Sequence, residues 1–197
     1  NIVTGGDSRA LYVASTSTAN RVINNKVENI SGGSKVYGLF VDVTSRDLFC
    51  DNNAIKNLTS LGDVFGIYIN NSKAPVVTNN TIESIRQISG STTSYADGIF
   101  IGTASDSSYI VNNSISGVYS SVNRTAAAYI PSGIKLNAGT THRVLYNSIN
   151  LYGSNSSTPA ATGASSAFTI SADAVTKVDV RNNIFNNKMY DATSPFN

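Results

Sequence analysis

The strongest constraint on the fold is a short phrase that recurs six times, an Asn followed two residues later by an aliphatic residue. In four copies this Asn is the second of an Asn-Asn pair, and those pairs begin at Asn24, Asn52, Asn79 and Asn112. Two looser copies follow, Tyr146-Asn147-Ser148-Ile149 and Arg181-Asn182-Asn183-Ile184. Six copies in 197 residues make coincidence implausible, so the chain consists of internal repeats.

A second phrase precedes each of these copies, a small residue followed by an apolar-any-apolar alternation. It begins at Ala10, Gly38, Gly66, Gly98, Gly133 and Ala167. From the small residue to the aliphatic residue of the Asn phrase the separation is always 16 or 17 residues, whereas the return segment varies from 11 to 18. One half of the repeat is therefore nearly rigid, and loops of variable length belong to the other half.

The repeat length selects the fold class. Alternation with a period of two predicts strands, and repeats of 28 to 35 residues are too short for two strands and a crossover helix. The sequence therefore predicts an all-β protein, a right-handed, single-stranded parallel β-helix of about six coils. We expect one domain over residues 1–197, with repeats at 10–37, 38–65, 66–97, 98–132, 133–166 and 167–197.

Three inward-facing columns follow from this register, and all are apolar. The first holds Leu11, Leu39, Ile67, Ile99, Ile134 and Phe168. The second holds Val13, Val41, Ile69, Ile101, Leu136 and Ile170. The third follows the Asn and holds Val27, Ile55, Ile82, Ile115, Ile149 and Ile184. Burial of each such side chain contributes roughly 1.5 to 3 kcal/mol before conformational entropy is subtracted.

The Asn residues themselves form a polar column within this apolar framework. Its predicted members are Asn25, Asn53, Asn80, Asn113, Asn147 and Asn182. Buried amides need partners, and at the strand spacing each amide can bond to the one above and the one below. Asn also tolerates the left-handed backbone of a sharp corner. We interpret the column as a structural ladder, with a role in ligand binding as the alternative.

Composition narrows the possible partners. Asn, Ser and Thr make up about 36% of the chain, only 13% is charged, and the net charge is +2 without any cluster of Lys or Arg. This pattern disfavours nucleic-acid binding. No apolar run approaches bilayer length, so we expect no membrane insertion. The lone Cys50 permits no internal disulfide and no cysteine metal cluster, and we predict neither a metal nor a cofactor.

Three polar residues interrupt the pattern. Asp51 falls at an offset that is mostly apolar in the other repeats, which a local bulge turning Cys50 inward and Asp51 outward would explain. The alternative is a buried functional carboxylate. His142, the sole histidine, has no carboxylate or thiol near it in sequence, so we expect a solvated surface residue. Asp97 precedes Gly98, where a role as a turn or hydrogen-bonding residue is expected.

These repeats, small-apolar-any-apolar strands followed by Asn-Asn-any-Ile turns, resemble those of the right-handed parallel β-helix proteins of the pectate-lyase-like superfamily over residues 10–187. The stretches 146–153 and 178–185, separated by a segment rich in Ser, Thr and Ala, more narrowly resemble the large secreted surface proteins of Bacteroidetes. That resemblance implies export by a type IX route and an extracellular or cell-surface location.

The superfamily includes polysaccharide lyases and hydrolases, so catalytic residues can be sought directly. Glycoside hydrolysis usually needs two converging carboxylates, which here means Asp or Glu at matching offsets of neighbouring coils. Asp42, Asp47, Asp106 and Asp173 have no carboxylate at the same offset above or below. The Asn-Thr-Asp, Asp-Asp and Gly-His-Gly phrases of galacturonan hydrolases and the Asp-rich calcium cluster of pectate lyases are also missing from the sequence. We assign no catalytic residue and leave enzymatic activity open.

The strongest functional signal is an outward column on the first strand of each repeat, which carries Tyr12, Phe40, Tyr68 and Phe100 and continues with Lys135 and Thr169. The next outward column contributes Asp42, Asn70 and Asn137. Rings repeating at strand spacing beside polar groups could stack on and hydrogen-bond a sugar chain. Alternatively, the rings stack on one another and are covered by the longer loops beginning at Ser84, Gly117 and Leu151.

We therefore expect a non-catalytic stalk or adhesin-type module of a longer secreted or cell-surface protein. Its expected partners are a polysaccharide or cell-surface glycan and the flanking domains of its own chain. The alternative function is that of a polysaccharide lyase or glycoside hydrolase whose catalytic residues come from unusual loops or from further coils.

Overall fold

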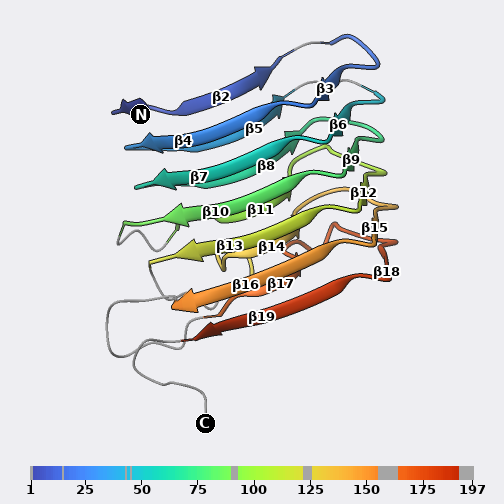
Figure 1. Ribbon diagram of the computed structural model, residues 1–197. Coiled ribbons are helices and arrows are strands. Elements are labelled where there is room, and N and C mark those ends of the chain that lie inside the picture. Colours follow the sequence, from blue (N-terminus) through green and yellow to red (C-terminus); the bar gives the residue numbers. More distant parts are fainter. Residues whose placement is uncertain are drawn as a thin grey trace.

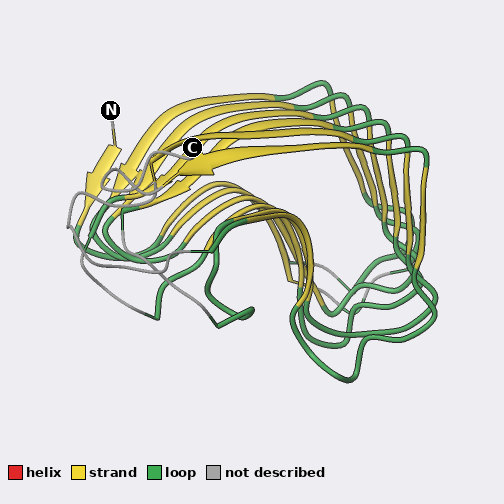
Figure 2. Ribbon diagram, turned by 90° about the horizontal axis from the view of Figure 1, so that it is seen from below, coloured by secondary structure: helices red, strands yellow, loops and turns green. Residues whose placement is uncertain are grey.

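The computed structural model describes residues 2–14, 16–42, 44, 46–89, 93–121, 126–154 and 164–190. Over this part the chain is an all-β solenoid without helices, in which every strand pairs in parallel with the equivalent strand of the neighbouring coil. The coils wind in the right-handed sense from the N-terminal to the C-terminal end (Figures 1 and 2). The predicted fold class is confirmed.

Three parallel sheets form the walls. The long sheet contains β1 (Ile2–Thr4), β4 (Lys26–Gly32), β7 (Ala54–Ser60), β10 (Thr81–Gln87), β13 (Ser114–Ser120), β16 (Ser148–Ser154) and β19 (Ile184–Tyr190). The aromatic sheet contains β2 (Ser8–Val13), β5 (Val36–Asp42), β8 (Val64–Asn70), β11 (Ala96–Ile101), β14 (Ser132–Leu136) and β17 (Ser166–Ile170). The short sheet contains β3 (Arg21–Ile23), β6 (Phe49–Asp51), β9 (Val76–Thr78), β12 (Tyr109–Val111), β15 (Arg143–Leu145) and β18 (Asp179–Arg181).

The strand register confirms the first two predicted columns throughout and the third through five coils. In the sixth coil the prediction is wrong by one residue, because Ile149 pairs with Phe185 and not with Ile184. Ile184 is 67% exposed on the outer face. Between β17 and β18 this coil has a longer connection than the coil before it, which the assumption of a constant separation did not allow for.

The asparagine ladder is present, with the same one-residue correction. Asn25, Asn53, Asn80 and Asn113 each donate from Nδ2 to Oδ1 of the next ladder Asn at 2.9 Å. Asn147 donates to Asn183, so Asn183 and not Asn182 ends the ladder. Each acceptor oxygen also receives the backbone N–H of the previous ladder residue. The buried amides therefore satisfy one another along the axis.

The small residue at the start of the strand phrase has a steric cause. A Cβ on Gly66 would lie 2.5 Å from the carbonyl oxygen of Gly98 and 2.7 Å from Cγ2 of Ile82. The aromatic sheet passes so close to the next coil and to the core that a side chain has no room at this point. The Gly at this point in the four middle coils follows from this approach.

The short sheet explains Asp51 without a bulge, so that part of the prediction is wrong. Val22, Cys50 and Val77 pair in regular register and face the core, and Ile23, Asp51 and Thr78 pair beside them as partly exposed residues. Cys50 is fully buried and Asp51 lies outward, as expected. Burial raises the pKa of the Cys50 thiol to about 12. Asp51 accepts hydrogen bonds from Thr78 Oγ1 at 2.8 Å and Asn79 Nδ2 at 2.7 Å.

Two further expectations concern the last repeat and membrane insertion. The last predicted repeat, 167–197, includes residues 191–197, which lie outside the described residues. Nothing long and apolar enough to cross a bilayer as a helix occurs in the part of the chain that the structure describes.

Candidate functional site

The outer surface of the aromatic sheet carries the residues that the sequence singled out. The register places Tyr12, Phe40, Tyr68, Phe100, Lys135 and Thr169 in one outward column, as predicted. A second outward column, which the period-two pattern does not predict, contains Arg9, Tyr37, Phe65, Asp97, Ser132 and Ser166. This column lies three residues before the first one, which breaks the period of two, and the strand pairing skips the small residue that lies between the two columns.

The two columns pack into one aromatic cluster. Successive rings of the first column lie 5.2, 5.1 and 4.9 Å apart from Tyr12 to Phe100. Tyr37 stacks on Phe40 at 4.6 Å, and Phe65 meets Tyr68 edge-on at 4.8 Å. Phe40 and Phe100 are consequently only 7% and 4% exposed, whereas Tyr12 is 49% exposed. Most ring faces are occupied by other rings, so the stripe is not an open stacking platform along its length.

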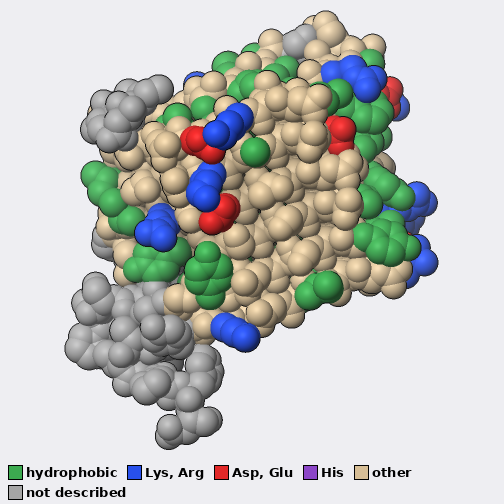
Figure 3. Space-filling view, in the orientation of Figure 1, with side chains coloured by type: hydrophobic (Ala, Val, Ile, Leu, Met, Phe, Trp, Pro, Cys, Tyr) green, Lys and Arg blue, Asp and Glu red, His purple; other side chains and the backbone are tan. Residues whose placement is uncertain are grey.

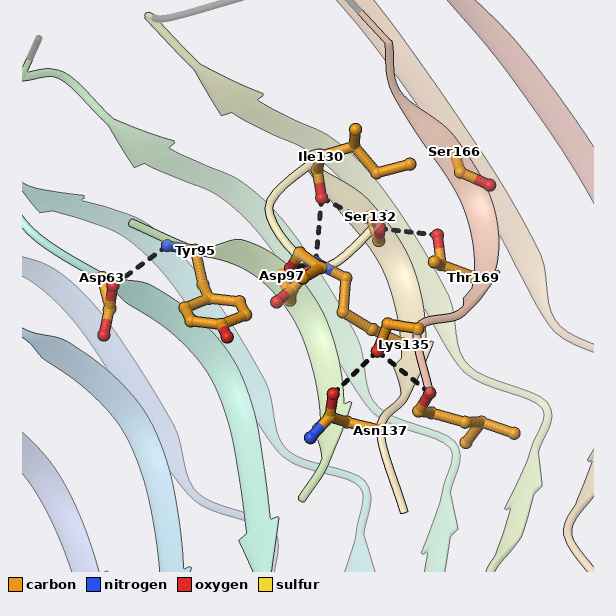
Figure 4. Close-up of polar contacts among 12 residues, drawn as sticks. Asp63, Tyr95, Asp97, Ile130, Ser132, Lys135, Asn137, Ser166 and Thr169 are labelled. Atoms are coloured by element: carbon orange, nitrogen blue, oxygen red, sulfur yellow. Dashed lines mark hydrogen bonds and ion pairs between the residues drawn. The ribbon is translucent and has the colours of Figure 1, made fainter. Parts of the chain in front are cut away.

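Lys135, predicted in the ligand-binding column, is instead completely buried. Its Nζ lies 2.8 Å from Oδ1 of Asp97, whose side chain is also fully buried. The same nitrogen donates to the carbonyl oxygens of Ala128 at 3.0 Å and Ile130 at 2.9 Å, in the turn that covers β14 (Figure 4). Three acceptors match the three protons of an ammonium group. Lys135 and Asp97 therefore form a structural ion pair, and Asp97 is more than a turn residue.

The remaining predicted polar residues are engaged with neighbouring coils. Asp42 Oδ1 accepts hydrogen bonds from the side-chain amides of Asn70 and Asn71 at 3.0 and 2.9 Å. Asn137 Oδ1 accepts one from Ser171 Oγ at 2.9 Å. Within the described residues nothing donates to Asn70 Oδ1, although that atom is buried. Asn137 also reaches a cavity at the middle of the sheet.

This cavity, of about 220 Å³, brings together three of the eight predicted ligand residues, Tyr68, Phe100 and Asn137. Its other six lining residues were not predicted from the repeat pattern, and they are Lys35, Tyr37, Asp63, Phe65, Tyr95 and Thr103. Loops extend past the aromatic sheet on both sides (Figure 2), and residues from both sets of loops line the cavity. Five aromatic residues form its wall, and an acidic, a basic, an amide and a hydroxyl side chain complete it.

The polar groups of the cavity are held in place. Asp63 accepts the backbone N–H of Tyr95 through Oδ1 at 3.0 Å and pairs through Oδ2 with Lys35 at 3.2 Å. Tyr95 packs on Phe65 and Phe100. Burial, with a smaller contribution from Asp42, raises the pKa of Tyr68 to about 12, and burial also raises the pKa of Tyr95. These phenols remain protonated at neutral pH and can donate hydrogen bonds.

His142 differs from the sequence expectation, because it is completely buried rather than solvated. Its Nδ1 lies 2.6 Å from Ser108 Oγ and its Nε2 lies 2.9 Å from the carbonyl oxygen of Ala138. A carbonyl only accepts, so Nε2 carries the proton and Ser108 donates to Nδ1. Burial lowers the pKa of His142, so the ring is neutral at pH 7. Ser108 is 1% exposed, so this hydrogen-bonded Ser-His pair is buried. It joins the turn before β12 to the turn before β15.

Carboxylates of the described chain mostly have identified partners. Glu28, Asp63, Glu83, Asp97 and Asp179 each pair with a Lys or Arg within 3.2 Å, and Asp42, Asp51 and Asp106 accept hydrogen bonds. No group of three or more potential metal-ligating side chains occurs among the described residues. Tyr37, Phe65 and Phe100 are at most 6% exposed, so the cavity offers apolar contact chiefly through the partly exposed Tyr68 and Tyr95, together with hydrogen bonding.

Comparison of the chain with protein-family models, with curated proteins and with solved structures gives no match in any of the three.

Proposed function

We propose that this chain is a non-catalytic, extracellular β-solenoid module of the stalk or adhesin type, which holds one sugar unit of a glycan in the cavity of the aromatic sheet. The observation that carries the proposal is the composition of that cavity, in which five aromatic residues lie beside Asp63, Lys35, Asn137 and Thr103. Sugar rings present apolar C–H faces and a rim of hydroxyl groups, and such a wall complements both.

The rigid support of these groups favours binding over chemistry. Asp63 is held by Lys35 and by a backbone N–H, and the rings are fixed by mutual packing. Preorganised side chains lose little entropy when a ligand arrives. The extracellular location, export by a type IX route and relation to pectate-lyase-like and Bacteroidetes surface proteins are parts of the same proposal, supported by the repeat pattern and by the neutral polar composition.

The test is a glycan array followed by affinity measurement on the glycans that bind. Tyr68→Phe removes only the hydroxyl from a cavity residue and Asp63→Asn removes only the charge, and we expect each to weaken binding by about three- to tenfold. Tyr146→Phe removes a hydroxyl from a 58% exposed residue of the short-sheet corner and should leave the affinity unchanged. If no glycan on the array binds, a purely structural role of the solenoid remains. If the protein releases new reducing ends from a polysaccharide, it is an enzyme.

A further inference from the structure

Two further hollows lie on the outer face of the long sheet. This sheet forms the wall opposite the aromatic sheet (Figure 2) and faces the viewer in Figure 3. Each of β4, β7, β10 and β13 contains one residue with left-handed backbone at the same place, namely Asn29, Asn57, Ser84 and Gly117, with φ between 57° and 62°. The strand pairing skips these residues. Repetition of the kink in adjacent strands produces a furrow that runs along the solenoid axis.

These two adjoining hollows occupy this furrow, with volumes of about 320 and 380 Å³, and Arg86 lines both. The first hollow lies over β4, β7 and β10, and the second continues over β10, β13 and β16. Five strands at the usual spacing of parallel strands give the furrow a length of roughly 19 Å. We call this surface the axial furrow.

The two halves of the furrow differ in chemistry. The first half is lined by side-chain amides and hydroxyls, including Asn29, Asn57 and Thr59. The second half is lined by Tyr119, Tyr152 and Ile88, of which Tyr152 and Ile88 are 45% and 48% exposed. Arg86 stands where the halves meet. The furrow therefore offers hydrogen bonds at one end, ring faces at the other and a guanidinium between them.

Arg86 is the charged residue that lines both hollows, and Lys188 on β19 is a further exposed cation of the same sheet, paired in register with Tyr152. On the same face, Lys26 pairs with Glu28 at 3.0 Å and Lys56 pairs with Glu83 at 2.9 Å, so these lysines are neutralised. Figure 3 shows the few charged side chains of this face against a mostly neutral surface. Arg86 is exposed and forms no ion pair with any residue that the structure describes. An arginine in this state can take a carboxylate or sulfate in two parallel hydrogen bonds.

We propose that the axial furrow binds an extended acidic polysaccharide along the solenoid axis, with an anionic group of the chain on Arg86. In the first half of the furrow, amide and hydroxyl groups occupy the equivalent position of β4, β7 and β10, at Asn29, Asn57 and Ser84. Their spacing of about 4.8 Å is comparable to the length of one sugar unit in an extended chain. An extended peptide has a shorter repeat, and its backbone could not pair with the long sheet because the furrow crosses the strands. This site is separate from the cavity of the aromatic sheet.

The experiment measures binding of alginate, hyaluronan and chondroitin sulfate to the whole chain, with esterified, uncharged alginate and poly-glutamate as comparison probes. We expect Arg86→Gln to lower the affinity for the acidic polysaccharide that binds by about tenfold. Tyr152→Ala should lower it several-fold. Arg143→Gln, the same change at an exposed position of the short sheet, should have no effect, and neither should the cavity variant Tyr68→Phe.

Three results would overturn the proposal. In one, none of the three acidic polysaccharides binds. In another, Arg86→Gln and Arg143→Gln weaken binding equally, which would indicate attraction to the general positive charge. In the last, poly-glutamate or the esterified alginate binds as tightly as the acidic chain. Because Tyr68→Phe affects only the cavity, failure of the furrow and failure of the proposed function remain distinguishable. Thermal unfolding of each variant verifies that the fold is retained.

Discussion

The two asparagines of each Asn-Asn pair have different roles, which their backbone conformations separate. The first residue of the pair, as in Asn52 and Asn112, has left-handed backbone with φ of 51° and 55° and lies exposed at the corner. The second residue, as in Asn113, turns inward and joins the ladder. Tyr146 occupies the first position in the fifth coil with φ of 57°, so the corner accepts other residues whereas every ladder position is an Asn.

Loss of a ladder asparagine should lower the free energy of unfolding much more than loss of the corner asparagine that precedes it in sequence. Asn113→Ala removes the oxygen that accepts two hydrogen bonds from Asn80. It also leaves the buried Asn147 Oδ1 with only the backbone N–H of residue 113 as a donor from that residue. We expect a decrease of about 2 to 4 kcal/mol in the free energy of unfolding. Asn112→Gly keeps the left-handed corner accessible and should change it by less than about 1 kcal/mol. Urea unfolding of both variants checks this, and equal effects would contradict the ladder's role.

At the scale of elements, His142 joins the turn after β14 to the turn before β12. Its folded-state pKa is lowered, mainly by burial, so the folded chain binds a proton there less readily than the unfolded chain does. Its contribution to stability is full above its unfolded pKa of about 6.5 and is lost as the pH falls from there through the lowered folded value.

Because His142 is the sole histidine, its effect on stability can be isolated. We expect the free energy of unfolding to fall between pH 6.5 and 5 with a slope no steeper than about 1.4 kcal/mol per pH unit. His142→Gln should flatten that segment of the curve. Urea titrations at half-unit pH steps provide the measurement. If the free energy of unfolding of His142→Gln falls with pH as steeply as that of the wild type, the proton that is bound on unfolding belongs to another group.

The regular elements could be predicted from the sequence because their cause is local and repeated. Inward residues such as Ile67 and Ile99 recur at a constant offset, and a small residue recurs where the coils approach closely. The loops are different, because their residues act on strands far away in sequence. Lys135 has the position of a surface residue in its strand, and it is buried by the turn at 126–131 and by Asp97 and Tyr95 of the previous coil.

The same distinction explains the candidate sites. Tyr68 and Phe100 were identified from their strand offset, whereas Asp63 and Tyr95 reach the cavity from loops whose lengths vary between repeats. The axial furrow was missed because its kinked positions hold Asn, Asn, Ser and Gly, which share a backbone conformation but no side-chain type. A search for a column of residues that tolerate left-handed backbone would have found it.

Over the whole molecule, burial of the inner columns is uneven along the axis. Ile67, Ile99 and Ile134 in the middle coils are fully buried, whereas Ile170 in the last strand of the aromatic sheet is 45% exposed. Phe185 and Val180 of the same coil are 41% and 38% exposed. In a solenoid each coil contacts only its neighbours, so stability is approximately a sum of coil and interface contributions. The coil of β17, β18 and β19 should therefore open most readily in this chain of 197 residues.

Two measurements test whether the stability of the coils varies along the solenoid axis. Hydrogen exchange should give the greatest amide protection in β7 to β13 and the least in the two end coils, β1 to β3 and β17 to β19. Opening of an end coil breaks one interface, whereas opening of a middle coil breaks two. Ile67→Ala should lower the free energy of unfolding by about 2 to 5 kcal/mol, and Ile170→Ala by less than about 1 kcal/mol. Uniform protection along the axis would mean that all coils unfold as one cooperative unit, since the interfaces between coils would then exceed the stability of any single coil.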